Sequence, residues 1–139
     1  MVEYQELLKM LKVCYQNIQV LHRHLVGDNW FGTHEQLQEY YEKIQDDIDE
    51  LCEVGLSIEI DEPTIRQSVE SYEELEIKNR DTNESYEIVK GYFNQIIAQI
   101  NRINGVPADV INLLQEKQLY YRKEANFKLF RALIEEIER

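Results

Sequence analysis

The fold is decided by residues 21–53, which read LHRHLVGDNWFGTHEQLQEYYEKIQDDIDELCE. A Gly-Asp-Asn break at residues 27–29 separates two patterns of helical spacing. Thr33, followed three residues later by Gln36, has the form of a capping box, in which each side chain satisfies a backbone N–H at a helix start. The stretch therefore predicts two helices joined by a compact corner, and the second helix is expected to begin at Thr33.

Long helices are predicted along the whole chain by apolar residues spaced three and four apart. Their expected ranges are Tyr4 to Leu25, Thr33 to about Ile58, Tyr86 to Ile103, and Pro107 to the end of the chain. Between the second and third helices, residues 59–83 are expected to form a long connection that holds a short helix after Pro63. A long connection at this place is typical of a ferritin-like four-helix bundle, so we predict an all-α fold of that kind.

The spacing also assigns individual side chains to the surface or to the core. On the second helix, Asp46, Asp47 and Glu50 lie off the apolar seam and are expected to form a solvated acidic face. On the fourth helix, Tyr121 is expected at the surface. The side chains expected to point inward there are Val110, Leu113, Leu114, Tyr120, Phe127, Phe130, Ile134 and Ile137.

The composition agrees with a single helical domain. The chain has 139 residues with two Pro and five Gly, so one domain covering residues 1–139 is expected. The formal net charge of −12 disfavours direct DNA binding, because phosphates are bound by clustered Lys and Arg. Cys14 and Cys52 are expected to be buried free thiols. We find no leader sequence and no apolar run long enough to span a membrane, which predicts a cytoplasmic protein.

Histidines and carboxylates make the deciding segment a candidate metal site. His22 lies in helical phase with the apolar stripe of the first helix, whereas His24 is rotated by about 200° and is expected at the surface. His34 occupies the first turn of the second helix, and Asp49 and Glu53 lie one turn apart further along it. Two imidazoles and two carboxylates, with no thiolate, suit Fe(II), Mn(II) or Zn(II).

The length of the second helix indicates that one chain cannot complete this site. Fifteen residues at about 1.5 Å each separate His34 from Asp49 by roughly 22 Å. Two copies of the helix, crossing antiparallel about a two-fold axis, would bring His34 of one chain beside Asp49 and Glu53 of the other. A shared site therefore predicts a homodimer.

These residues resemble the Dps-like miniferritins of the ferritin-like superfamily. The pattern is His22, eleven residues, His34, fourteen residues, Asp49, three residues and Glu53, together with the turn WFGTHE and the acidic helix DDIDELCE. The resemblance implies a hollow dodecamer with ferroxidase sites at its two-fold interfaces. There the histidines of one subunit and the Asp and Glu of its mate would bind Fe(II), with Glu53 as the bridging or strongest ligand. Peroxide would oxidise the iron, which the cavity would then store.

Some positions depart from the family pattern. Gln38 stands one turn after His34, where the family usually has an acidic residue, and a neutral amide is a poorer iron ligand. Arg23 replaces an aromatic residue, and the family's basic N-terminal tail is missing. The alternative is therefore a ferritin-like assembly with a degraded ferroxidase site, and a third interpretation is a monomeric four-helix interaction module. Trp30 is expected to pack in the corner or at a dimer contact, with uptake of oxidising equivalents as its other role.

Overall fold

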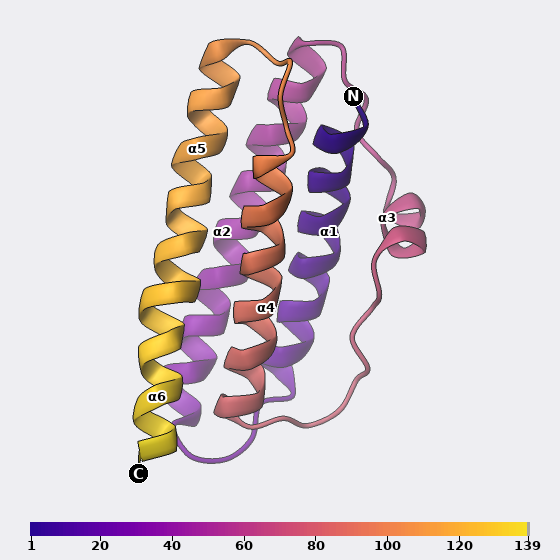
Figure 1. Cartoon of the computed structure of the whole chain (residues 1–139). Helices are drawn as coiled ribbons and strands as arrows, with labels where there is room; N and C mark the ends of the chain where they lie inside the picture. The colour runs from indigo at the N-terminus through magenta and orange to yellow at the C-terminus, as the bar shows by residue number, and fades with distance from the viewer. Residues whose placement is uncertain (139) are drawn as a thin grey trace. The chain divides into compact units, whose positions relative to one another are not determined.

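The structure is a computed structural model that describes residues 1–138, and the side chains of residues 1–134. Its helices are α1 (Val2–Arg23), α2 (Trp30–Ser57), α3 (Ile65–Ser71), α4 (Thr82–Asn101) and α5 (Ala108–Lys123), which continues through the π-helical η1 (Glu124–Leu129) into α6 (Phe130–Glu138) (Figure 1). Residues 1–138 contain no β-strand, and an isolated bridge joins Leu25 to Arg80. The predicted all-α fold class is confirmed.

The chain divides into two compact units, Met1–Thr82 and Asn83–Arg139. The first unit holds α1, α2 and α3, and the second unit begins within α4. A single domain over residues 1–139 stays a prediction. None of the helices in the described part of the chain has both the length and the apolar composition of a membrane span.

Helices α1 and α2 of the first unit run antiparallel. Near the start of α1, the Tyr4 hydroxyl donates to the carbonyl of Leu51 near the end of α2, at 2.6 Å. At the other end of the pair, the ring of His22 stacks on the ring of His34. A Cβ added to Gly55 would lie 2.9 Å from Cε1 of Tyr4, so glycine is needed where the helices approach closely. Burial raises the pKa of Tyr4 to about 12, so the hydroxyl remains a donor at neutral pH.

The corner between α1 and α2 differs from the sequence prediction. Helix α2 begins at Trp30, three residues before the predicted start at Thr33. The corner ends there because Asn29 adopts a left-handed conformation with φ of 62°. Thr33 lies inside the helix, where its N–H donates to the carbonyl of Asn29 at 3.0 Å. The predicted capping box at Thr33 is therefore wrong. A capping box does form at the start of α3, between Thr64 and Gln67.

Asn17 on α1 holds the long connection in place. This side chain is 1 % exposed. Its amide donates to the carbonyl of Glu73 at 3.1 Å and accepts from the N–H of Leu75 at 2.9 Å. The side-chain amide of this one residue thus bonds one backbone carbonyl and one backbone N–H of a segment that lies outside the helices.

Replacing Asn17 with alanine should lower the free energy of unfolding by about 1–3 kcal/mol, because it leaves both backbone groups of the connection without this partner. Urea denaturation at fixed protein concentration measures the loss. Gln16→Ala, at the exposed neighbouring position, is the matched control and should change stability by less than about 0.5 kcal/mol. Equal losses for the two variants would contradict the anchoring role.

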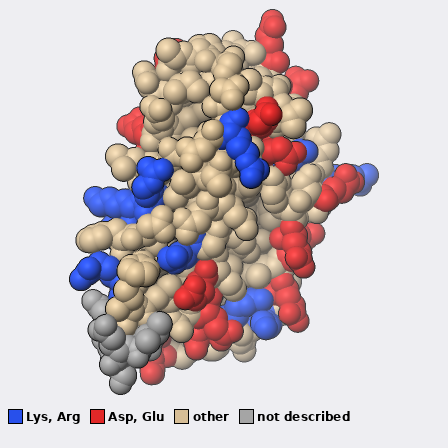
Figure 2. Space-filling model, in the orientation of Figure 1, with Lys and Arg blue, Asp and Glu red and all other residues tan. Residues whose placement is uncertain are grey.

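Charged side chains of both signs lie beside one another on the face drawn in Figure 2. On α2, Asp46 and Glu50 are exposed, as predicted. Asp47 is not part of a solvated face, because it is 1 % exposed and pairs with Lys43 at 2.6 Å. The lysine one turn earlier supplies the opposite charge that a buried carboxylate requires. Cys14 and Cys52 are both buried and both free, as predicted.

Helices α4 and α5 of the second unit also run antiparallel. Gln118 on α5 donates to the carbonyl of Ile97 at 3.0 Å and to the side-chain oxygen of Asn101 at 2.7 Å. Further along the pair, the ring of Phe93 meets the edge of Tyr121, with centroids 5.0 Å apart. The contacts pair later residues of α5 with earlier residues of α4, which fixes the antiparallel direction.

The last helix buries Val110 and Leu114 as predicted, but further along it buries a different stripe from the one that its spacing predicts. Tyr121 is 1 % exposed and forms part of the core, whereas Phe127 and Phe130 are 55 % and 47 % exposed. The buried positions are Val110, Leu114, Lys117, Gln118, Tyr121, Glu124, Ala125, Leu129 and Leu133. From Tyr121 onward the buried apolar positions continue in steps of four through Ala125, Leu129 and Leu133, because the π-helical turns of η1 hold more residues than α-helical turns do. The predicted position of Ile137 lies outside the described side chains.

Candidate metal centre

The corner between α1 and α2 brings two imidazole rings together. His22 lies in the last turn of α1, and His34 lies in the first turns of α2. Their ring centroids are 3.7 Å apart and their planes differ by 26°. Both rings are half-buried. The structure thus joins the two predicted nitrogen ligands within one chain.

The histidine pair forms the middle of a column of aromatic rings. Trp30 stacks on His34, with centroids 4.3 Å apart and an angle of 16° between the planes. On the other side of the pair, the ring of Tyr41 meets His22 edge-on at 5.3 Å. The indole N–H of Trp30 donates to the carbonyl of Leu25 at 2.9 Å. The column therefore connects the start of α2 to the end of the α1 segment.

The Nε2 atom of His22 is a buried nitrogen whose hydrogen-bonding capacity is unused. It has no hydrogen-bond partner within the described part of the chain. Burial lowers the pKa of His22 below its ordinary value, and the nearby charges of His34 and Arg23 lower it further. A neutral imidazole with an unused nitrogen is the form that binds a metal ion. This orphaned nitrogen fits a metal site.

The two predicted carboxylate ligands stand apart from the histidines. Asp49 and Glu53 are both exposed on α2. Among the described residues, no group of three or more His, Cys, Asp or Glu side chains is placed to hold a metal ion. One chain by itself therefore supplies two nitrogen donors at one place and leaves the carboxylates facing outward.

Other candidates around the histidines have different surroundings. Gln38 is exposed, and its amide donates to the carboxylate of Glu42 one turn later at 2.9 Å. His24 caps the end of α1 and is half-buried.

The sequence did not predict the stacking of Trp30 on His34, because a helix start at Thr33 places Trp30 in the corner. With α2 beginning at Trp30, this residue lies four positions before His34 and thus on the same side of the helix.

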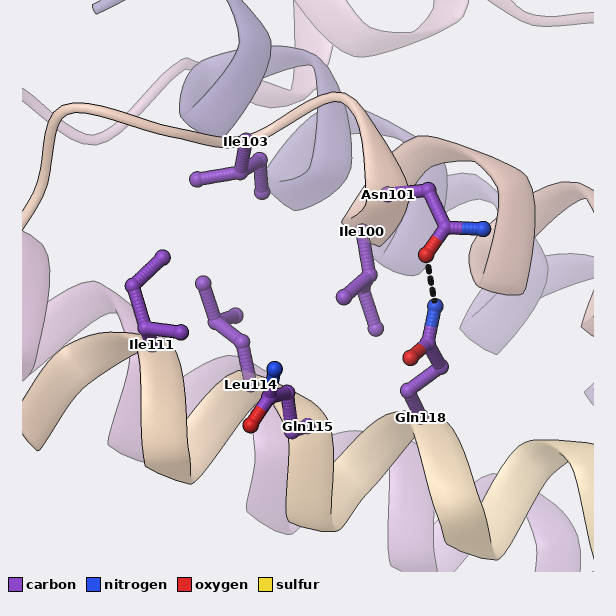
Figure 3. A pocket seen from close by; sticks show the side chains of 7 residues that line it. All are labelled: Ile100, Asn101, Ile103, Ile111, Leu114, Gln115 and Gln118. Carbon is purple, nitrogen blue, oxygen red and sulfur yellow. Dashed lines mark hydrogen bonds between the residues drawn. The ribbon is translucent and has the colours of Figure 1, made fainter. Parts of the chain in front are cut away.

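A cavity of about 120 Å³ lies in the second unit between the end of α4 and the start of α5 (Figure 3). Its lining residues are Ile100, Asn101, Ile103, Ile111, Leu114, Gln115 and Gln118. Apolar and amide side chains of this kind include no carboxylate, imidazole or thiol. The cavity therefore offers poor ligands for iron.

Comparison with known proteins gives a match by structure. The sequence matches no protein-family model and no curated protein. Dps from Staphylococcus aureus superposes with a TM-score of 0.85 at 20 % identity, covering 95 % of this chain and 93 % of that one. Mycobacterium smegmatis Dps gives a TM-score of 0.79 at 16 % identity, with coverages of 91 % and 82 %. Listeria innocua Dps, from a crystal soaked with zinc, gives a TM-score of 0.64 at 21 % identity, covering 87 % of this chain and 90 % of that one.

These matches extend over most of the chain and most of each Dps protein. Dps structures are ferritin-like four-helix bundles. The architecture that the long connection predicts is therefore confirmed, and so is the resemblance to Dps-like proteins at the level of fold. The chain has the ferritin-like four-helix-bundle fold of the Dps proteins.

Proposed function

We propose that the protein oxidises Fe(II) with hydrogen peroxide and stores the Fe(III) that results. Iron is its substrate, and the sites are shared between two copies of the chain across a two-fold interface. The observation that carries the proposal is the stacked pair of His22 and His34, with the buried Nε2 of His22 left unpaired. Asp49 and Glu53 of the second copy complete the set of ligands.

The chemistry of the donors suits this substrate. Imidazole nitrogens and carboxylate oxygens without a thiolate are suitable ligands for iron, and Mn(II) and Zn(II) fit the same set. Peroxide accepts two electrons and two protons to give two water molecules, so each peroxide oxidises two Fe(II) ions.

The exposed face of α2 supports a two-fold partner. Phe31 and Asp49 are eighteen residues apart, which is five helical turns, so they share one face. Leu56 lies two turns after Asp49 on this face. Phe31 and Leu56 are 85 % and 57 % exposed, and exposed apolar residues on one face favour contact with another protein surface. An antiparallel copy of α2 on this face would place Asp49 and Glu53 near the partner's histidines, and we propose that such dimers build a dodecamer.

Size and iron oxidation together test this function. The purified protein should elute near the volume of a dodecamer, and it should accelerate the loss of Fe(II) after addition of peroxide. Elution as a monomer would contradict the shared site and favour an interaction module. A rate equal to that of the protein-free solution would contradict the oxidation.

The second candidate function is a ferritin-like assembly with a degraded site, which Gln38 favours because its amide bonds Glu42 and is a poor iron ligand. We expect Gln38→Asp to raise the ratio of bound iron to protein only if the native site is incomplete. Elemental analysis of the two proteins after identical loading measures this ratio. An unchanged ratio, with iron already bound by the wild type, would contradict the degraded site.

A further inference from the structure

We infer that Trp30 is a positioning residue that orients His34, and through it His22, for metal binding. The inference rests on the proposed function, since it concerns the same pair of histidines. Trp30 has no atom that ligates iron well, so it acts through its neighbour. Its contacts join the two segments from which the histidines come.

Trp30 is held at two points. Its indole N–H donates to the carbonyl of Leu25 at 2.9 Å, just after the end of α1. Its ring lies nearly parallel to that of His34, at 4.3 Å and 16°. The hydrogen bond fixes the direction of the indole, and the indole plane in turn sets the plane of the imidazole. The start of α2 is thereby tied to the α1 end that carries His22.

The ring of His34 is enclosed on both faces. Trp30 stacks on it at 4.3 Å and His22 stacks on it at 3.7 Å. Two stacked rings cannot share one face of a five-membered ring, so they cover opposite faces. Only the edge of the imidazole, which carries the nitrogens, remains open, and a metal ion binds there in the plane of the ring. Trp30 thus removes rotamers of His34 that would turn the nitrogens away.

The stack also favours the metal-bound state electrostatically. An imidazole that binds a cation gains positive character, and the electron-rich face of tryptophan attracts positive charge more strongly than other aromatic rings do. A leucine at position 30 would keep an apolar side chain there but would lack both the plane and the donor. A phenylalanine would keep the plane and lose only the hydrogen bond to Leu25.

The test uses Co(II) alone, without peroxide, on the full-length assembled protein. Its affinity is measured from the visible absorption of bound Co(II). Trp30→Leu should weaken binding about 10- to 100-fold, as the loss of supporting contacts around metal ligands does. Trp30→Phe should stay within about threefold of the wild type, because it keeps a stacked ring. The matched control Phe127→Leu, a change at a 55 % exposed ring outside the column, should bind as the wild type does.

A second measurement needs no variant of Trp30. It is the only tryptophan in the sequence, so its fluorescence reports on the ring beside His34. Co(II) should quench this fluorescence in the wild type with the same affinity that the absorption gives, and His34→Ala should abolish the quenching. Fluorescence that does not respond while Co(II) binds would overturn the inference.

The outcomes distinguish a failure of the proposed histidine site from a failure of the positioning role of Trp30. Equal Co(II) binding by wild type and His34→Ala would remove the histidine site and the role of Trp30 together. Binding that is lost in His34→Ala but unchanged in Trp30→Leu would leave the proposed function standing and overturn the positioning role alone. Unchanged helical circular dichroism and elution volume of Trp30→Leu ensure that weakened binding reflects the site.

Discussion

Replacing His22 and His34 together with alanine should reduce peroxide-dependent loss of Fe(II) to the rate of the protein-free solution. The stacked rings are the two nitrogen donors of the proposed site, so their removal would leave its carboxylates without imidazole partners. We expect the rate to fall by more than about tenfold, since removal of even supporting groups around a metal costs 10- to 100-fold. Absorbance of an Fe(II) chelator, sampled after peroxide addition, measures the rate.

His24→Ala is the matched control for this prediction. His24 follows His22 by two positions, caps the end of α1 and makes no contact with the ring column that the structure describes. Its removal should leave the rate of Fe(II) loss unchanged. A double variant of His22 and His34 that still oxidises iron as fast as His24→Ala would contradict the assigned site.

The second large effect concerns stability. Phe93→Ala should lower the free energy of unfolding by about 3–5 kcal/mol, because it empties a fully buried ring position. Phe93 is 0 % exposed and meets the edge of Tyr121 at 5.0 Å. Urea denaturation followed by circular dichroism measures the loss. Protein concentration must be held constant, because assembly links unfolding to concentration.

Phe127→Ala makes the same chemical change at an exposed ring of the last helix. Phe127 is 55 % exposed, so we expect a loss of less than about 1 kcal/mol. The regular α-helical spacing of the sequence predicts the opposite, since it places Phe127 in the core. A loss for Phe127→Ala as large as that for Phe93→Ala would contradict the π-helical register.

Helical spacing was sufficient to predict the fold class. The apolar residues spaced three and four apart along α1 and α4 are mostly buried, with Tyr15 and Tyr86 half-buried, because tertiary packing follows helical phase where the helix is regular. Phase also distinguished His22, which enters the ring column, from His24, which does not. Helix α4 ends at Asn101 and α5 begins at Ala108, each within two residues of the predicted Ile103 and Pro107, and proline favours a helix start because it fixes φ.

Other features depend on contacts that a linear pattern does not contain. The left-handed Asn29 moved the start of α2 to Trp30, and so the stack on His34 could not be predicted. Tyr120 and Tyr121 are adjacent residues of the same type, and only the packing of the helix determines that Tyr121 lies in the core. Asp47 is buried because Lys43 neutralises it one turn away. The proposed site also needs the carboxylates of a second copy of the chain, and the structure of one chain does not place them.

Mixed assemblies test the shared site most directly. One chain carries His22→Ala and His34→Ala, and the other carries Asp49→Ala and Glu53→Ala. Each variant alone should be inactive. Random pairing makes about half of the dimers mixed, and each mixed dimer has one complete site out of two, so mixing should restore about one quarter of the wild-type rate.

The measurement is the rate of Fe(II) loss with peroxide after the two variants have been co-expressed in equal amounts. Recovery to about one quarter of the wild-type rate is the result we predict, because the intact histidines of one chain then meet the intact carboxylates of the other. Two inactive variants that stay inactive when co-assembled would contradict a site shared across the two-fold interface.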